Sequence, residues 1–170
     1  IRQVTRLLFH FSAMGLMFCQ WGLFSLPWWW IVIALIVCTG IINAYNFMDG
    51  INGITGGYSL VVLTALAIIN AEIIPFVEGD FIYTVICSVV VFCFFNFRKR
   101  AKCFAGDVGS VSIAFILLFL LGKLIIQTGD FSWIVLLSVY GVDSVLTIIH
   151  RLMLHENIGL PHRKHLYQLM

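Results

Sequence analysis

The sequence predicts an all-α, polytopic membrane protein with about six transmembrane helices. Hydrophobic residues make up 61% of the 170-residue chain and charged residues only 11%, a composition unlike that of ordinary soluble domains. The apolar residues form blocks of about 20, the length that crosses a bilayer as a helix. Basic residues gather at alternate ends of these blocks. We therefore expect residues 1–170 to form a single membrane domain.

Each expected span ends at a short polar or turn-forming segment. A Ser-Leu-Pro turn follows the first span, three Trp residues suited to an interfacial belt open the second, and an acidic loop follows the third. The spans are about Val4–Leu23, Trp29–Phe47, Ile54–Ile74, Phe81–Phe95, Val111–Ile126 and Trp133–Ile149, and a tail, His150–Met170, closes the chain. The five cysteines form no CxxC pair, which favours buried thiols over a zinc site or a disulfide framework.

The positions of Lys and Arg predict the orientation of the chain. Arg2 and Arg6, the basic residues of 98–102, and Arg151, Arg163 and Lys164 all flank one set of span ends. Lys123 is alone among the acidic residues of the other set. The positive-inside rule then places the N-terminus, the 98–102 loop and the tail in the cytoplasm. The unusual polar segments described next share that side.

The first polar segment is residues 43–53, here called the first motif. Asn43, Asn46 and Asp49 recur every three residues and would share one arc of a helix surface, and glycines follow. A carboxylate and two amides beside a flexible backbone suit a metal, a phosphate or a nucleotide. The simpler alternative is a helix cap followed by an Asp-Gly turn.

The second polar segment is residues 104–110, the second motif, with the sequence Phe-Ala-Gly-Asp-Val-Gly-Ser. Asp107 and Ser110 would lie at the N-terminus of the fifth span, where backbone N–H groups and the helix dipole favour phosphate oxygens. Asp107 could also bind Mg²⁺, which proteins hold with one or two carboxylates plus phosphate and water. A glycine turn with an N-cap explains the same residues equally well.

Two further features carry candidate functional residues. The tail holds His162, Arg163 and His165, which could neutralise a diphosphate, although a basic stop-transfer tail is the structural alternative. Asp143 lies inside the sixth span. A carboxylate there is costly and indicates either a functional role or a hydrogen bond to a neighbouring helix.

Together, these residues resemble the polyprenyl-phosphate N-acetylhexosamine-1-phosphate transferase family. This family includes bacterial enzymes that begin O-antigen and teichoic-acid linkage synthesis, and the phospho-N-acetylmuramoyl-pentapeptide transferase. Its pattern Asn-x-x-Asn-x-x-Asp-Gly-x-x-Gly matches the first motif, and its pattern Phe-x-Gly-Asp-x-Gly-Ser matches the second. The resemblance extends over roughly residues 2–168, including the His- and Arg-rich tail.

The resemblance implies an enzyme that transfers a sugar 1-phosphate from a UDP-N-acetylhexosamine to undecaprenyl phosphate and releases UMP. Asp107 and Asp49 would act at the Mg²⁺ site, with Mn²⁺ as an alternative metal. Asn43 and Asn46 would help to position the donor, Phe104 would pack against the uracil, and the tail residues His162, Arg163 and His165 would hold phosphates. The enzyme would lie in the bacterial inner membrane with its active site facing the cytoplasm. A homodimer is compatible with this resemblance, and no nucleic-acid partner is expected.

Three departures from the family pattern qualify this expectation. The family's Asp-Asp pair is absent, so we expect the chain to be the C-terminal part of a longer protein and to be inactive alone. Asn52 stands where the family often has Asp. The tail lacks the histidine triplet of the muramoyl-pentapeptide enzyme, which favours simple UDP-sugars such as UDP-N-acetylglucosamine. The alternative functions are a transporter or channel built on Asp143 and glycine-broken segments, and a non-catalytic membrane assembly subunit.

Overall fold

A computed structural model describes residues 3–98 and 100–154. Within these ranges the chain is built from helices and turns and contains no strand. The helices are α1 (Gln3–Trp21), the 3₁₀ turn η1 (Leu23–Ser25), α2 (Trp28–Met48), α3 (Ile54–Ile68) with its π-helical extension η2 (Ile69–Ile73), α4 (Gly79–Asn96), α5 (Gly106–Thr128), the 3₁₀ helix η3 (Phe131–Leu137) and α6 (Ser138–Met153).

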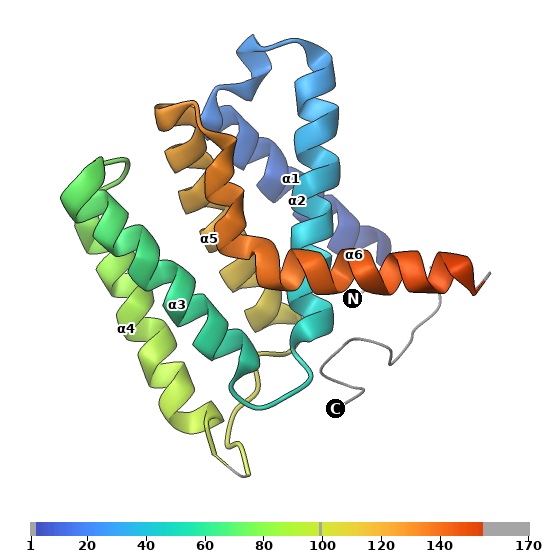
Figure 1. Ribbon diagram of the computed structural model, residues 1–170, viewed down its shortest axis with the longest axis vertical. Helices are drawn as coiled ribbons and strands as arrows, with labels where there is room; N and C mark the ends of the chain where they lie inside the picture. The colour runs from blue at the N-terminus through green and yellow to red at the C-terminus, as the bar shows by residue number, and fades with distance from the viewer. Residues whose placement is uncertain (1–2, 99, 155–170) are drawn as a thin grey trace.

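The helices pack as a bundle around α5 and α3 (Figure 1). Helices α3 and α4 form an antiparallel pair along one side, while α2 and α1 pack against α5 on the other. The centre is filled by leucines that are at most 1% exposed: Leu63 and Leu66 of α3, and Leu117, Leu120 and Leu124 of α5. Leucine is not branched at Cβ, so it loses little rotamer freedom in a helix while burying a large apolar area.

The outer surface of the bundle is also apolar, as a lipid-facing surface must be. Ile36, Val61 and Val91 are each more than half exposed on three different helices. Five segments of the described chain are long and apolar enough to cross a membrane: Trp28–Met48, Ile54–Ile73, Gly79–Asn96, Gly106–Thr128 and Phe131–His150. Helices satisfy their own backbone hydrogen bonds, which is what hydrocarbon requires of a spanning segment. The predicted all-α polytopic membrane fold is therefore confirmed.

The last apolar segment differs from the straight span that the sequence predicts. It begins as the 3₁₀ helix η3 and changes at Ser138 into α6, which runs across the direction of the other helices (Figure 1). At this bend the Tyr58 hydroxyl donates a hydrogen bond to the carbonyl oxygen of Leu136 (2.8 Å). The Tyr58 ring also packs on Tyr140, with ring centroids 4.3 Å apart. Hydropathy gives no sign of this bend, at which a side chain from α3 contacts the segment.

Outside the membrane segments, Asp130 begins η3. Its carboxylate accepts hydrogen bonds from the backbone N–H and the hydroxyl of Ser132, both 2.8 Å long. These bonds favour the charged form and lower the pKa of Asp130. Asp130 is thus an N-cap, the role that Asp commonly has at a helix start.

The close packing of α1 on α5 gives a stability prediction. A Cβ atom on Gly122 would collide with the indole ring of Trp21, so Gly122→Ala should destabilise the bundle by about 1–3 kcal/mol, the usual cost of overpacking. Gly40→Ala is the matched control, because a Cβ there meets no atom within 4 Å. The melting temperatures of the two variants in detergent test this. Equal values would mean that Trp21 moves aside without cost.

Candidate active site

The first motif ends helix α2. Asn43 and Asn46 lie in its last two turns, the former exposed and the latter half-buried. The helix stops at Met48, and Asp49 is the first residue beyond it. The expectation that all three share one helical arc is therefore right for the two asparagines and wrong for Asp49. The reason is the turn that follows, in which the Gly50 N–H donates to the Met48 carbonyl (2.8 Å).

The Asp49 carboxylate joins the two motifs. Its Oδ1 accepts a hydrogen bond from the Thr55 hydroxyl (2.7 Å), and its Oδ2 accepts one from the backbone N–H of Gly106 (2.9 Å). Hydrogen bonds to an ionised acceptor are roughly twice as strong as neutral ones. Asp49 thus connects the end of α2 to the start of α5, although Asp49 and Gly106 are 57 positions apart in the sequence.

The second motif forms the first turns of helix α5. The sequence predicts that this span starts near Val111, but the helix begins at Gly106. Gly106 has φ +58°, a backbone conformation that side chains with a Cβ rarely adopt. Asp107 follows it in the first helical turn and is exposed. Because Asp49 accepts from the Gly106 N–H, it takes up one of the backbone donors that a helix start leaves without an intrahelical partner.

A second contact between the motifs lies one turn deeper. Ser110 is fully buried, and its hydroxyl lies within hydrogen-bonding distance of the Asn46 amide oxygen (3.0 Å) and the Gly106 carbonyl (2.7 Å). Asn46, Asp49, Asp107 and Ser110 therefore gather where α2 and α5 meet. The structure thus brings together these four residues of the two motifs, and Asn43 lies exposed on α2.

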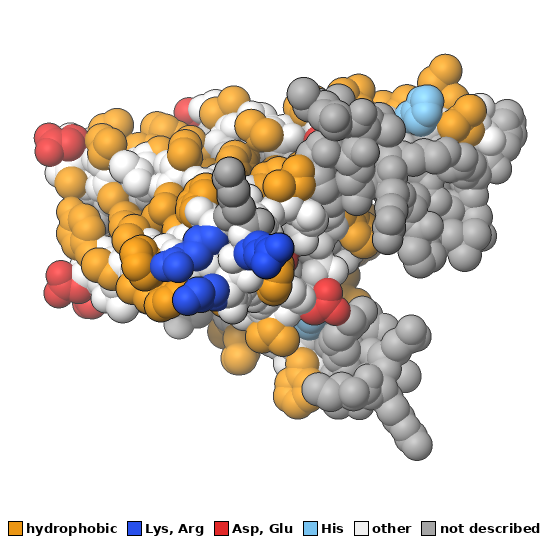
Figure 2. Space-filling view, turned by 90° about the horizontal axis from the view of Figure 1, so that it is seen from below, with side chains coloured by type: hydrophobic (Ala, Val, Ile, Leu, Met, Phe, Trp, Pro, Cys, Tyr) orange, Lys and Arg blue, Asp and Glu red, His pale blue; other side chains and the backbone are white. Residues whose placement is uncertain are grey.

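Basic side chains gather in one cluster at this end of the bundle. Lys and Arg side chains cluster on the face seen from below in Figure 2. The loop between α4 and α5 carries Arg98, Arg100 and Lys102, the last two exposed. The Arg98 guanidinium is held against α4, where its Nε donates to the Phe94 carbonyl (3.1 Å) and its carbon lies 4.9 Å from the Phe94 ring centre. This loop is therefore basic, which favours the binding of phosphates near it.

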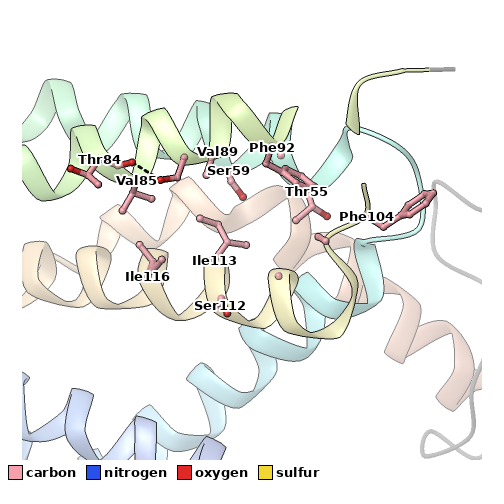
Figure 3. A pocket seen from close by; sticks show the side chains of 14 residues that line it. Thr55, Ser59, Thr84, Val85, Val89, Phe92, Phe104, Ser112, Ile113 and Ile116 are labelled. Atoms are coloured by element: carbon pink, nitrogen blue, oxygen red, sulfur yellow. Dashed lines mark hydrogen bonds between the residues drawn. The ribbon is translucent and has the colours of Figure 1, made fainter. Parts of the chain in front are cut away.

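A pocket of about 330 Å³ extends from the second motif along the groove between α3, α4 and α5 (Figure 3). Its walls are mainly apolar, with a few hydroxyls that include Thr55 and Ser59. Phe104 lies at its mouth, 71% exposed, with its ring pointing away from the other lining side chains. The exposed ring is free to stack on a planar group, whereas the pocket itself suits an apolar group.

The described residues contain no cluster of three His, Cys, Asp or Glu side chains that could hold a metal by themselves. A Mg²⁺ site needs fewer protein ligands, since one or two carboxylates with phosphate and water are sufficient. Asp107, exposed in the first turn of α5, fits that requirement. Asp49 already accepts two hydrogen bonds, so the geometry gives it a structural role in addition to the metal-binding role that the resemblance implies.

His162, Arg163 and His165 lie outside the described residues. Asp143 lies on α6 and is half-buried.

The sequence matches a known protein family over most of the described chain. The model of glycosyl transferase family 4 matches residues 3–125, about three quarters of the chain. The chain belongs to this family. The match covers both motifs and ends within α5.

Curated members of the family are similar to the chain over part of their length. A probable undecaprenyl-phosphate N-acetylglucosaminyl 1-phosphate transferase of Bacillus subtilis is 30% identical over 85% of this chain and 41% of the relative. An undecaprenyl-phosphate α-N-acetylglucosaminyl 1-phosphate transferase of Yersinia pestis is 25% identical over 95% of this chain and 46% of the relative. A phospho-N-acetylmuramoyl-pentapeptide-transferase of Lactiplantibacillus plantarum is 33% identical over 54% of this chain and 28% of the relative. The chain spans less than half the length of these relatives, and no solved structure matches it significantly.

The sequence analysis does not single out two polar residues that have partners in the candidate site, Thr55 and Asn96. Thr55, which donates to Asp49, is 3% exposed, and Asn96 at the end of α4 is 5% exposed. Each is a polar residue at the end of an apolar helix, a pattern that normally indicates only a cap. Their importance depends on partners that are distant in sequence or separated by a turn, which residue spacing alone does not disclose.

Proposed function

We propose that the complete protein transfers N-acetylhexosamine 1-phosphate from a UDP-sugar to undecaprenyl phosphate. The product would begin an envelope polysaccharide. The names of the relatives support the phosphosugar and the lipid acceptor, and UDP-N-acetylglucosamine is the donor that we favour. The observation that carries the proposal is the hydrogen bond between Asp49 and the Gly106 N–H, because it holds the two motifs together at one basic end of a membrane bundle.

The proposed reaction is a single phosphoryl transfer. An oxygen of undecaprenyl phosphate attacks the β-phosphorus of the UDP-sugar and forms the new P–O bond. The bond between that phosphorus and the bridging oxygen breaks, and its electron pair leaves with UMP. The lipid then carries the sugar through a diphosphate. Catalysis of such a transfer is largely a matter of positioning and charge neutralisation.

Residues of the two motifs and of the tail would supply the positioning and the charge neutralisation. Asp107 would hold a Mg²⁺ ion at the N-terminus of α5, where it would neutralise charge on the diphosphate oxygens. The exposed Phe104 ring would stack on the uracil. Asn46 and Ser110, which contact each other, would fix the start of α5 relative to α2. His162, Arg163 and His165 would add phosphate contacts from the tail.

The orientation that we propose places this end of the bundle in the cytoplasm of a bacterium. The basic loop of residues 98–102 supports it, because cytoplasmic loops carry an excess of Lys and Arg. Cytoplasmic UDP-sugars would then reach the site directly. The acceptor phosphate would approach from the inner leaflet of the inner membrane.

The test uses the protein encoded by the complete reading frame, purified in detergent. It is incubated with undecaprenyl phosphate and UDP-N-acetylglucosamine that carries radioactive phosphorus in its β-phosphate. We expect the label to enter the organic phase with an equal amount of UMP released. EDTA should reduce transfer to background, and added Mg²⁺ should restore it, because the diphosphate needs a divalent cation to balance its charge.

The identity of the released nucleotide decides between reaction classes. Release of UDP instead of UMP, with label absent from the lipid, would indicate transfer of the sugar alone and would contradict the proposal. Full activity in EDTA would contradict the metal role. A panel of other UDP-sugars in the same assay identifies the donor.

A further inference from the structure

Helix α4 ends in a buried amide. Asn96 is its last residue and is only 5% exposed, and a buried amide must find partners for both its oxygen and its nitrogen. Its Oδ1 accepts a hydrogen bond from the Gly53 N–H (2.6 Å), and its Nδ2 donates one to the Cys103 carbonyl (2.8 Å). One side chain therefore contacts two different loops.

These loops belong to the two motifs. Gly53 is the last residue of the first motif and the N-cap of α3. Cys103 directly precedes Phe104, the first residue of the second motif. Asn96 thus lies between the turn after Asp49 and the segment that leads to Asp107. The Asp49 bond fixes the start of α5 relative to α2, and the Asn96 bonds fix the segment before α5 relative to α3.

Neighbouring bonds fold the intervening loop back over the end of α4. The Lys102 N–H donates to the Phe95 carbonyl (3.0 Å), and the Asn52 amide donates to the Arg98 carbonyl (3.2 Å). Both, however, lie at the exposed surface, where water competes. The Asn96 bond to Gly53 is buried and its bond to Cys103 is part-buried, so Asn96 is the better-protected link between the loops.

We propose that Asn96 is a positioning residue that sets the separation of the two loops between which the donor nucleotide binds. This inference rests on the proposed function for the identity of the ligand. The chemistry requires an amide. A carboxylate at this position accepts from Gly53 but cannot donate to Cys103, and a methyl group does neither. Loosening the link would let the Phe104 ring and the 50–53 turn move apart.

The protein contains a matched control at the opposite end of the bundle. The Asn70 side chain also holds a loop, since its Oδ1 accepts hydrogen bonds from the backbone N–H groups of Phe76 (2.9 Å) and Val77 (3.1 Å). Asn70 uses only its oxygen in these bonds. Asn70→Asp therefore keeps both bonds, whereas Asn96→Asp loses one of its two. The same chemical change should thus affect only position 96.

The first measurement needs no substrate. Native Cys103, which is half-buried, is alkylated with N-ethylmaleimide in membranes containing the full-length protein, and mass spectrometry of its peptide gives the rate. Asn96→Asp should raise the rate about tenfold, the factor that corresponds to one hydrogen bond of ordinary strength. Asn70→Asp should leave it unchanged. An unchanged rate at Cys103 in Asn96→Asp would overturn the proposal.

The second measurement is kinetic. Asn96→Asp should raise the KM for the UDP-sugar about tenfold and lower kcat by a smaller factor, and Asn70→Asp should change neither. A fall in kcat alone, with KM unchanged, would indicate a purely structural role and would overturn the proposal. Should Asn96→Asp not fold, Asn96→Ala with Asn70→Ala answers the same question without a buried charge. If the wild type transfers no phosphosugar, the proposed function fails, while the Cys103 rates still decide whether Asn96 holds the loops.

Discussion

Asp107→Asn is expected to lower kcat of the full-length protein in the proposed phosphosugar transfer by about 100- to 1000-fold, the range typical for loss of one preorganised electrostatic group. The substitution keeps the size of the side chain and removes its charge. Asp107 is exposed in the first turn of α5, so the bundle should remain folded. The loss would arise because an amide binds Mg²⁺ far more weakly than a carboxylate does.

Asp80 provides the control for this prediction. It is the acidic residue of the first turn of α4, at the opposite end of the bundle from the motifs, and Asp80→Asn should leave kcat unchanged. Initial rates are measured over a series of Mg²⁺ concentrations. We expect Asp107→Asn to need more Mg²⁺ for half-maximal activity. If this variant had the wild-type kcat and the wild-type Mg²⁺ dependence, Asp107 would not be a ligand of the proposed Mg²⁺ site.

Asp49→Asn is expected to reduce activity by about 100-fold through a different cause. An Asn side chain can accept from the Gly106 N–H with its oxygen and donate to the Thr55 hydroxyl with its NH₂ group, but both bonds then lose the carboxylate charge. A hydrogen bond to a charged group contributes about 1.5–3 kcal/mol and a neutral one about 0.5–1.5 kcal/mol, so losing the charge at both bonds costs roughly a factor of 30 to 150 in the population of the joined loops. The α5 start should then separate from α2.

Hydrogen exchange separates this cause from loss of a metal ligand. Asp49→Asn should accelerate exchange of the backbone amides at the start of α5, including Gly106, whereas Asp107→Asn should not. Thr55→Ser keeps the hydroxyl that donates to Asp49 and should behave like the wild type in both assays. Unchanged exchange at Gly106 in Asp49→Asn, with activity lost, would mean that Asp49 acts on the substrate or metal alone.

Much of the fold could be predicted because lipid imposes simple rules. A run such as Trp28–Met48 is apolar over a full bilayer thickness, and only a helix satisfies its backbone there. The bend between η3 and α6 could not be predicted, since it involves the Tyr58 hydroxyl on another helix. The start of α5 at Gly106 could not be predicted from the sequence for a related reason. Apolar patterning begins at Val111, but the backbone turns helical at Gly106, where Asp49 accepts its N–H.

The candidate site shows the same division. Asp49, Asp107 and Asn46 could be predicted because carboxylates and amides are conspicuous at the ends of apolar helices and match a family pattern. Asn96 could not, because its role depends on which two loops meet at the end of α4. Sequence identifies groups with suitable chemistry. The distances that decide which of these groups can reach a substrate and which one links two loops depend on tertiary packing.

The link between Asp49 and Gly106 also has a consequence for biogenesis. Its partners are 57 positions apart, so a ribosome adding about 5–20 residues each second needs roughly 3–11 s to produce the second after the first. During that interval α3 and α4 are synthesised, and the Asp49 carboxylate cannot yet accept its hydrogen bond from the Gly106 amide. The end of the bundle that holds the candidate site is therefore completed late, after the α3–α4 hairpin has been synthesised, and nascent chains that stall before α5 emerges carry an unfinished site.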